Sequence, residues 1–250
     1  MDNNKNILIS AAAIAIGLVV SAFLISDGLS SIKSNNRYVT VRGANEQDVK
    51  SNLVVWQLRF KTTGDDLIAT QADLDKQKQA VIDFLTKAGF DGKSIEPQGI
   101  RVVDKQANEY GGDAANSKRY VLSTAVNLRS DNVDLAMKTQ QKMSDLIKSG
   151  VALSDDGYCG NIPNYLFTKL NDIKIDMLAK ATKNARDAAG QFASDANAKV
   201  GSIRNATQGY FSISGQDDAP EGAGGNNNCG GADSIMKKIR VVTTIDYFLE

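Results

Sequence analysis

The chain has 250 residues, 42% of them apolar, which is enough for one large domain or two small ones around a hydrophobic core. Lysine plus arginine equal aspartate plus glutamate at 29 each, so the basic surface that nucleic acid partners require is not expected. The absence of histidine excludes serine–histidine and cysteine–histidine catalytic systems and the histidine-based zinc sites.

An uncharged, mainly apolar segment runs from Ile7 to Ile25. At about 1.5 Å per residue, a helix of this length spans about 28 Å, close to the hydrocarbon thickness of a bilayer. We predict that residues 1–25 form one transmembrane anchor. A cleaved signal peptide is the alternative, because Lys5 precedes the apolar run, although no A-x-A cleavage site follows it.

The charges that flank this segment leave its orientation open. Lys33, Arg37 and Arg42 follow the segment, whereas only Lys5 and the amino terminus precede it, so the positive-inside rule alone would keep the rest of the chain in the cytoplasm. The segment nevertheless lies where an export signal lies, and we predict export of the C-terminal bulk. Residues 26–37, rich in serine, asparagine and glycine, are predicted to be a linker.

The next recognisable elements are a strand and a helix. Strict alternation of apolar and mostly polar residues predicts a half-buried strand, with Val54, Trp56, Leu58 and Phe60 on its apolar face. After Gly64, the carboxylates of Asp65 and Asp66 are suited to cap a helix, which Gly89 ends. Its apolar positions are Leu67, Leu74, Val81, Leu85 and Ala88, and we expect the helix to cover one face of the sheet.

Four further elements are predicted from the same kinds of sequence pattern. We predict strands from Ile95 to Val103 and from Tyr120 to Leu128, paired with each other in antiparallel fashion. A helix with apolar positions from Val133 to Ile147 and a strand from Asn164 to Lys169 come next. The order β-α-β-β-α-β predicts an α+β fold with a mainly antiparallel sheet in split βαβ, ferredoxin-like order and both helices on one side.

A longer helix is predicted to start at Asn171 or Asp172. Its stripe is rich in alanine, which permits close approach of a neighbour, either the sheet or another subunit. The stripe comprises Ile173, Met177, Ala181, Ala185, Ala188, Phe192 and Ala196.

The chain ends with a predicted C-terminal hairpin. Its strands run from Gly201 to Ser214 and from Lys237 to Leu249, and the second is expected to bring the C-terminus into the sheet. The glycine-rich connection from Gly215 to Asp233 lacks the GxxxxGK[ST] pattern of a phosphate loop, so nucleotide binding is not expected.

The two cysteines, Cys159 and Cys229, can pair in an oxidising compartment. Closing a loop of this length would stabilise the fold by about 4 kcal/mol in the chain-entropy description. Two unrelated thiols are an equal alternative. No CxxC pattern is present, which argues against redox catalysis and against a zinc knuckle.

Adjacent carboxylates occur at Asp65 and Asp66 and again at Asp155 and Asp156. Such pairs are suited to acid–base chemistry or to a hard cation, but at helix starts and turns their ordinary role is capping and solvation. We therefore expect no catalytic residue, no metal site and no cofactor, and predict that the chain is not an enzyme. Carboxylate chemistry at these pairs is the remaining enzymatic alternative.

Several segments together match a known family. The earlier ones are Tyr38–Gly43, the strand ending in Phe60, Leu85–Phe90, Ile95–Ile100 and Arg119–Ser123, and the later ones are Asn164–Lys174, Ala181–Arg186 and Val200–Gly201. The earlier segments resemble the SIMPL domain family, the former DUF541, and the resemblance extends over about Tyr38 to Glu250. The later segments are similar to the bacterial periplasmic branch of that family, the 26 kDa antigen and oxidative-stress-defence type.

The resemblance implies an exported, envelope-associated and self-assembling protein with an accessory role in envelope or oxidative stress, and it supplies no catalytic residue. We expect one SIMPL-like domain over residues 38–250, in the periplasm, tethered to the inner membrane or released if residues 1–25 are cleaved. The expected partners are further copies of the chain and other envelope proteins. The alternative is a periplasmic binding module, with a cleft between sheet and helix for a small molecule or an envelope protein.

Overall fold

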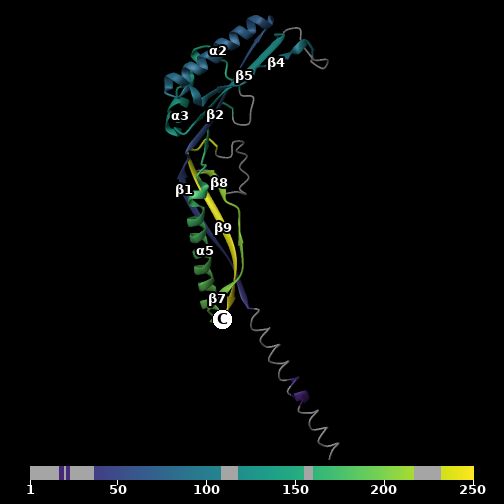
Figure 1. The fold of residues 1–250 in the computed structure, drawn as a ribbon, viewed down its shortest axis with the longest axis vertical. Helices are drawn as coiled ribbons and strands as arrows, with labels where there is room; N and C mark the ends of the chain where they lie inside the picture. The colour runs from purple at the N-terminus through teal and green to yellow at the C-terminus, as the bar shows by residue number, and fades with distance from the viewer. Residues whose placement is uncertain (1–16, 20, 23–36, 108–117, 155–159, 217–231) are drawn as a thin grey trace, which may run out of the picture. The chain divides into compact units, whose positions relative to one another are not determined.

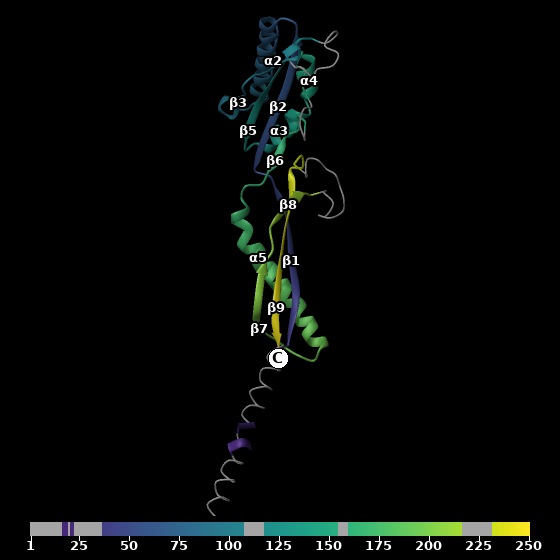
Figure 2. The same ribbon diagram turned by 90° about the vertical axis from the view of Figure 1, so that its right-hand side faces the viewer.

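The computed structural model describes residues 17–19, 21–22, 37–107, 118–154, 160–216 and 232–250. The chain divides into two compact units, which Figures 1 and 2 show as ribbons. Unit 1 comprises Met1–Asn45, Asp176–Phe211 and Val241–Glu250, and unit 2 comprises Glu46–Ile175 and Ser212–Arg240.

The predicted membrane segment from Ile7 to Ile25 lies largely outside the described residues. Its described residues, 17–19 and 21–22, are helical, and the Ser21 hydroxyl donates a hydrogen bond of 2.7 Å to the Gly17 carbonyl. In the part of the chain that the structure describes, no helix is long and apolar enough to cross a membrane. The anchor therefore stays a prediction.

Unit 2 is built on a five-stranded antiparallel sheet in the order β3-β5-β2-β6, with β4 also paired to β5. The predicted α+β class with antiparallel sheets is thus confirmed. The elements follow the predicted β-α-β-β-α-β order when β3 with β4, and α3 (Val133–Gln140) with α4 (Met143–Lys148), are each counted as one element. The strands are β2 (Leu53–Gly64), β3 (Ile95–Pro97), β4 (Arg101–Asp104), β5 (Tyr120–Ser130) and β6 (Asn164–Leu166).

The helix α2 (Leu67–Ala88) covers one face of this sheet (Figure 1). Asp66 caps it as predicted, because its carboxylate accepts a hydrogen bond of 2.8 Å from the Ala69 N–H. Gly89 ends it in the left-handed conformation, at φ 108°. The side chains buried between helix and sheet include Leu74, Val81 and Leu85 from α2 and Val54, Trp56, Leu58 and Phe60 from β2.

Three predicted elements of unit 2 are interrupted or shorter than expected. The strand predicted from Ile95 to Val103 is split into β3 and β4, because residues 98–100 leave the ladder where the Thr124 hydroxyl bonds to the Gln98 carbonyl at 3.0 Å. The predicted second helix is divided into α3 (Val133–Gln140) and α4 (Met143–Lys148), close to a hydrogen bond from the Thr139 hydroxyl to the Leu135 carbonyl, a contact that bends helices. Strand β6 ends at Leu166. Two short 3-10 helices, Gly92–Ser94 and Lys105–Ala107, complete the described elements of this part of the chain.

A second sheet has the order β1-β9-β7, where β1 is Tyr38–Lys50, β7 is Val200–Gln208 and β9 is Met236–Leu249. Most of it belongs to unit 1, whereas residues 46–50 of β1 and 236–240 of β9 are assigned to unit 2. The remaining strand, β8 (Ser212–Gly215), belongs to unit 2 and pairs with the first residues of β9. The sequence analysis placed no strand at β1, because the second half of this strand is mostly polar and has no apolar alternation. The prediction that the last strand joins the β2–β5 sheet was wrong, since β9 lies between β1 and β7 in a separate sheet.

The helix α5 (Leu170–Asp195) covers one face of the unit 1 sheet, as both views show (Figures 1 and 2). Its buried positions recur every four residues: Met177, Ala181, Ala185, Ala189 and Ala193. The predicted stripe is confirmed at Met177, Ala181 and Ala185, and Ile173 and Ala188 are partly buried. It is wrong at its end, where Phe192 is 57% exposed and Ala196 is exposed, because the fully buried face continues through Ala189 and Ala193. Residues 188 and 189 are both alanine, so the residue type alone could not show which of them is buried against the sheet.

Tyr165 of β6 is a buried titratable group in the unit 2 core. Its side chain is 2% exposed and its hydroxyl makes no hydrogen bond with any described residue. Burial, with a smaller contribution from the negative charge of Asp134, raises the pKa of Tyr165 from 10.0 to about 12.

We expect stability to fall as the pH rises from about 10 to about 12, because an unfolded tyrosine ionises at the lower value and a folded Tyr165 only at the higher one. Two pKa units correspond to about 3 kcal/mol, all of it present below pH 10. Urea unfolding at several pH values should show that Tyr165→Phe removes this loss. The control Tyr210→Phe, at a position 99% exposed, should retain it; equal pH slopes in the two variants would contradict the assignment.

Candidate functional site

Four of the predicted site residues lie outside the described residues. They are the cysteines Cys159 and Cys229 and the carboxylates Asp155 and Asp156. The disulfide and a chemical role for this acidic pair therefore stay predictions.

The other acidic pair is occupied by structural contacts. Asp66 caps α2, while Asp65 accepts a hydrogen bond of 2.5 Å from the Lys118 ammonium and one of 3.3 Å from the Arg119 N–H. The Lys118 contact is the main cause that lowers the pKa of Asp65. A carboxylate with a lowered pKa is a poor general acid or base near neutrality. At this pair, the structure shows capping and ion pairing, which are the ordinary roles of such residues.

Other charged side chains also form ion pairs within the protein. The Arg119 guanidinium lies 2.9 Å from the Asp104 carboxylate and lowers the pKa of that group. On α5, the Lys180 ammonium pairs with Asp176 at 2.6 Å, one of the i,i+4 contacts expected of a solvated helix face. Among the described residues, no three acidic, cysteine or histidine side chains are grouped so that they could hold a metal ion.

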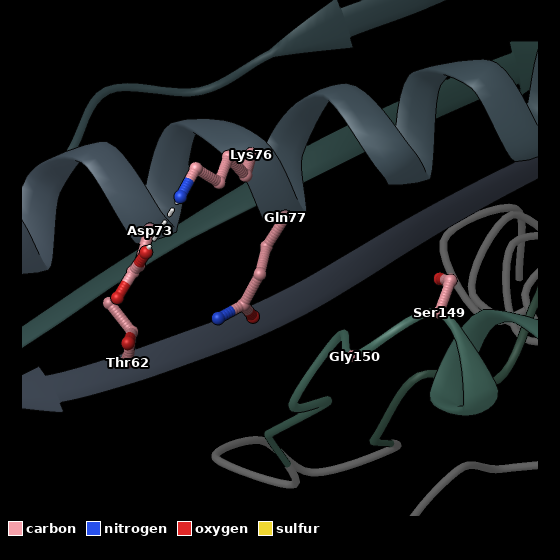
Figure 3. Close-up of a pocket in the computed structure, with 6 residues that line it drawn as sticks. All are labelled: Thr62, Asp73, Lys76, Gln77, Ser149 and Gly150. Carbon is pink, nitrogen blue, oxygen red and sulfur yellow. Dashed lines mark hydrogen bonds and ion pairs between the residues drawn. The ribbon is translucent and has the colours of Figure 1, made fainter.

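A cleft lies between sheet and helix in unit 2, the kind of position that the binding-module alternative predicts. It has a volume of about 330 Å³ (Figure 3). The side chains of Asp73 and Gln77 point from α2 toward β2, where Thr62 lies. The residues that line it are Thr62 of β2, Asp73, Lys76 and Gln77 of α2, and Ser149 and Gly150 after α4.

The polar groups of this cleft are largely used within the protein. The Lys76 ammonium lies 3.3 Å from the Asp73 carboxylate, and the Gln77 side-chain oxygen accepts a hydrogen bond of 3.1 Å from the Ala152 N–H. The cleft thus offers hydrogen bonds, but the charges of Lys76 and Asp73 compensate each other. The sequence analysis did not single out these residues. The signal that could have found them is the i, i+3, i+4 spacing of Asp73, Lys76 and Gln77, which places the three side chains on one face of α2.

The outer edge of the unit 1 sheet is a second candidate surface. Strand β7 is the last strand on its side, and residues 202–208 are all exposed. The Gly209 N–H bonds to the Val242 carbonyl of β9 at 2.8 Å. Because N–H groups of an antiparallel strand alternate in direction, those of Gln208 and Ala206 point away from β9. This edge has no strand partner among the described residues.

Exposed apolar side chains accompany this edge in the same unit. Ile203 of β7 is 50% exposed, and Tyr210 directly after β7 is 99% exposed. An unpaired strand with exposed apolar neighbours is a typical template for pairing with another chain.

Comparison with known proteins gives one family match. A family model described as "SIMPL: Protein of unknown function (DUF541)" matches residues 39–241. No curated protein matches the chain. Among solved structures, the "Crystal structure of an uncharacterized conserved protein from Listeria innocua" aligns over 79% of this chain and 91% of that chain, at 13% identity and a TM-score of 0.19. A TM-score this low supports no inference about fold or function.

Proposed function

The chain belongs to the SIMPL family, and on this premise we propose that it is a non-enzymatic envelope protein that assembles with further copies of itself through the outer edge of β7. The observation that carries the proposal is the nine-residue strand β7, which is paired on one side only among the described residues. Pairing with a second chain would satisfy its outward N–H and C=O groups and cover neighbouring apolar side chains. The paired carboxylates of Asp65 and Asp104 support a non-enzymatic role.

The proposed location follows from the sequence. The apolar segment from Ile7 to Ile25 would tether the protein to the inner membrane, with the two compact units in the periplasm, and the SIMPL resemblance suggests an accessory role in envelope or oxidative stress. A reporter enzyme fused to Glu250 tests the location, because periplasmic and cytoplasmic reporters require opposite compartments. Activity of the cytoplasmic reporter alone would contradict this part of the proposal.

The variant Ala206→Pro tests assembly through β7. Proline removes the outward N–H at this position and leaves in place the hydrogen bonds that Gly209 and its alternate neighbours make to β9. We expect light scattering of the purified protein to show an oligomer for the unchanged chain and a shift toward monomer for Ala206→Pro. The control Ala206→Thr retains the N–H and should assemble like the unchanged chain.

Thermal unfolding of both variants separates lost assembly from lost folding. A monomer at the highest attainable concentration of the unchanged chain would contradict self-assembly. An oligomer that persists in folded Ala206→Pro would exclude the β7 edge as its interface.

A further inference from the structure

The outer edge of β7 is regular over one short stretch. Residues 205–208 pair with β9 in unbroken register. A register shift between Ile203 and Asn205 interrupts the ladder before this stretch, and β7 ends at Gln208 after it. Because a bulge disturbs the ladder of the strand that contains it, a second strand can pair regularly with β7 only along residues 205–208.

The outward backbone groups of this stretch are arranged symmetrically about Thr207. The Gly209 N–H points toward β9, so the N–H and C=O groups of Ala206 and Gln208 point outward. If two copies of the stretch run antiparallel about a two-fold axis at Thr207, Ala206 of one copy lies opposite Gln208 of the other. Each such pair can exchange both of its N–H···O=C hydrogen bonds, so the stretch is its own complement.

Other two-fold registers would require irregular backbone. An axis one or two residues earlier would bring the N–H and C=O groups of Arg204 into the new ladder, and Arg204 lies at the register shift. An axis one residue later would require those of Tyr210, which lies beyond the end of β7. Only the axis at Thr207 uses the regular stretch alone.

The side chains along this stretch do not oppose pairing. Free edges are usually protected by charged residues or proline, whereas residues 205–208 are Asn, Ala, Thr and Gln. The nearest charge is that of Arg204, whose guanidinium lies 4.1 Å from the centroid of the Tyr38 ring of β1. This contact holds the charge over the protein's own sheet and away from the edge.

We propose that β7 pairs with β7 of a second copy in antiparallel fashion, about a two-fold axis at Thr207. The inference rests on the assembly proposed above and specifies its partner strand, its direction and its register. It would join the two β1-β9-β7 sheets into one continuous sheet. The Thr207 side chains of the two copies would then face each other, a cross-strand pair of the kind that stabilises sheets.

Disulfide cross-linking of the full chain tests the register. In a background of Cys159→Ser and Cys229→Ser, which removes both natural thiols, Thr207→Cys places two cysteines opposite each other with Cα atoms about 4.5 Å apart. In the matched control, Asn205→Cys, the two cysteines would lie about 14 Å apart, too far for a disulfide. After oxidation with diamide, we expect at least about tenfold more covalent dimer for Thr207→Cys than for the control on a denaturing gel.

Charge substitutions test the same axis in a chain that keeps both natural cysteines. Thr207→Arg and Thr207→Glu each set like charges against each other across the axis, so each variant alone should self-associate at least about tenfold more weakly. A mixture of the two variants should recover association, because opposite charges then meet. Mixing would not reverse a loss of folding, so this recovery separates a defect of the interface from a defect of the fold.

Light scattering of the unchanged chain distinguishes failure of this inference from failure of the assembly proposal. An oligomer in which Thr207→Cys yields no more covalent dimer than Asn205→Cys would overturn the two-fold axis at Thr207 and leave assembly in place. Failure of the mixed charge variants to associate would overturn it as well. A monomer at the highest attainable concentration would overturn both proposals.

Discussion

Deletion of Val241–Glu250 is expected to unfold unit 1. These residues contribute most of β9, the central strand between β1 and β7, and include the buried side chains of Val241, Ile245 and Tyr247. Truncation of one large buried side chain costs about 2–5 kcal/mol, whereas the free energy of unfolding of a typical protein is only about 5–15 kcal/mol. The loss of three such side chains is therefore comparable to the whole stability of a typical protein. The cut also removes the hydrogen bonds that β1 and β7 make to β9.

Hydrogen exchange followed by mass spectrometry measures this outcome element by element. We expect α5 and β7 to lose protection, while β2 and β5 keep theirs, because their core of Trp56, Leu58 and Leu128 lies within unit 2. Deletion of Glu250 alone, which is exposed, is the control and should leave protection of α5 unchanged. Full protection of α5 in the longer deletion would show that unit 1 does not depend on β9.

Local sequence patterns predicted those parts of the fold whose signals are local. The alternation around Trp56 predicted β2, and the cap residues Asp66 and Gly89 predicted the ends of α2. Both signals depend only on near neighbours in the chain.

The features that were missed depend on contacts between distant residues. Alternation in β9 indicates which side chains are buried but not which strands lie beside it, so its pairing with β1 could not be predicted. The cleft between α2 and β2 depends on the packing of the helix on the sheet, which brings Asp73 and Gln77 toward Thr62.

Gly43 of β1 lies very close to the backbone of α5, and Gly43→Ala is expected to be strongly destabilising. A Cβ atom at this position would overlap the Ala181 carbonyl and the Ala185 N–H and would lie 2.8 Å from the Ala185 Cβ. The first two contacts are with backbone, so no side-chain rotation relieves them and α5 must move away from β1. Overpacking of this kind costs about 1–3 kcal/mol, and we expect at least the upper value here because two backbone atoms are involved.

Gly190→Ala provides a matched control, because it makes the same substitution in α5 at a position where an added Cβ meets no atom within 4 Å. Removing a glycine from a helix interior stabilises it by about 0.5–1 kcal/mol, so the two substitutions should change the free energy of unfolding in opposite directions. Urea unfolding of both variants measures this difference. Ala185→Gly added to Gly43→Ala should not restore stability, since the carbonyl of Ala181 and the N–H of residue 185 remain in place. Equal stability of the two single variants would show that α5 does not pack on Gly43 in solution.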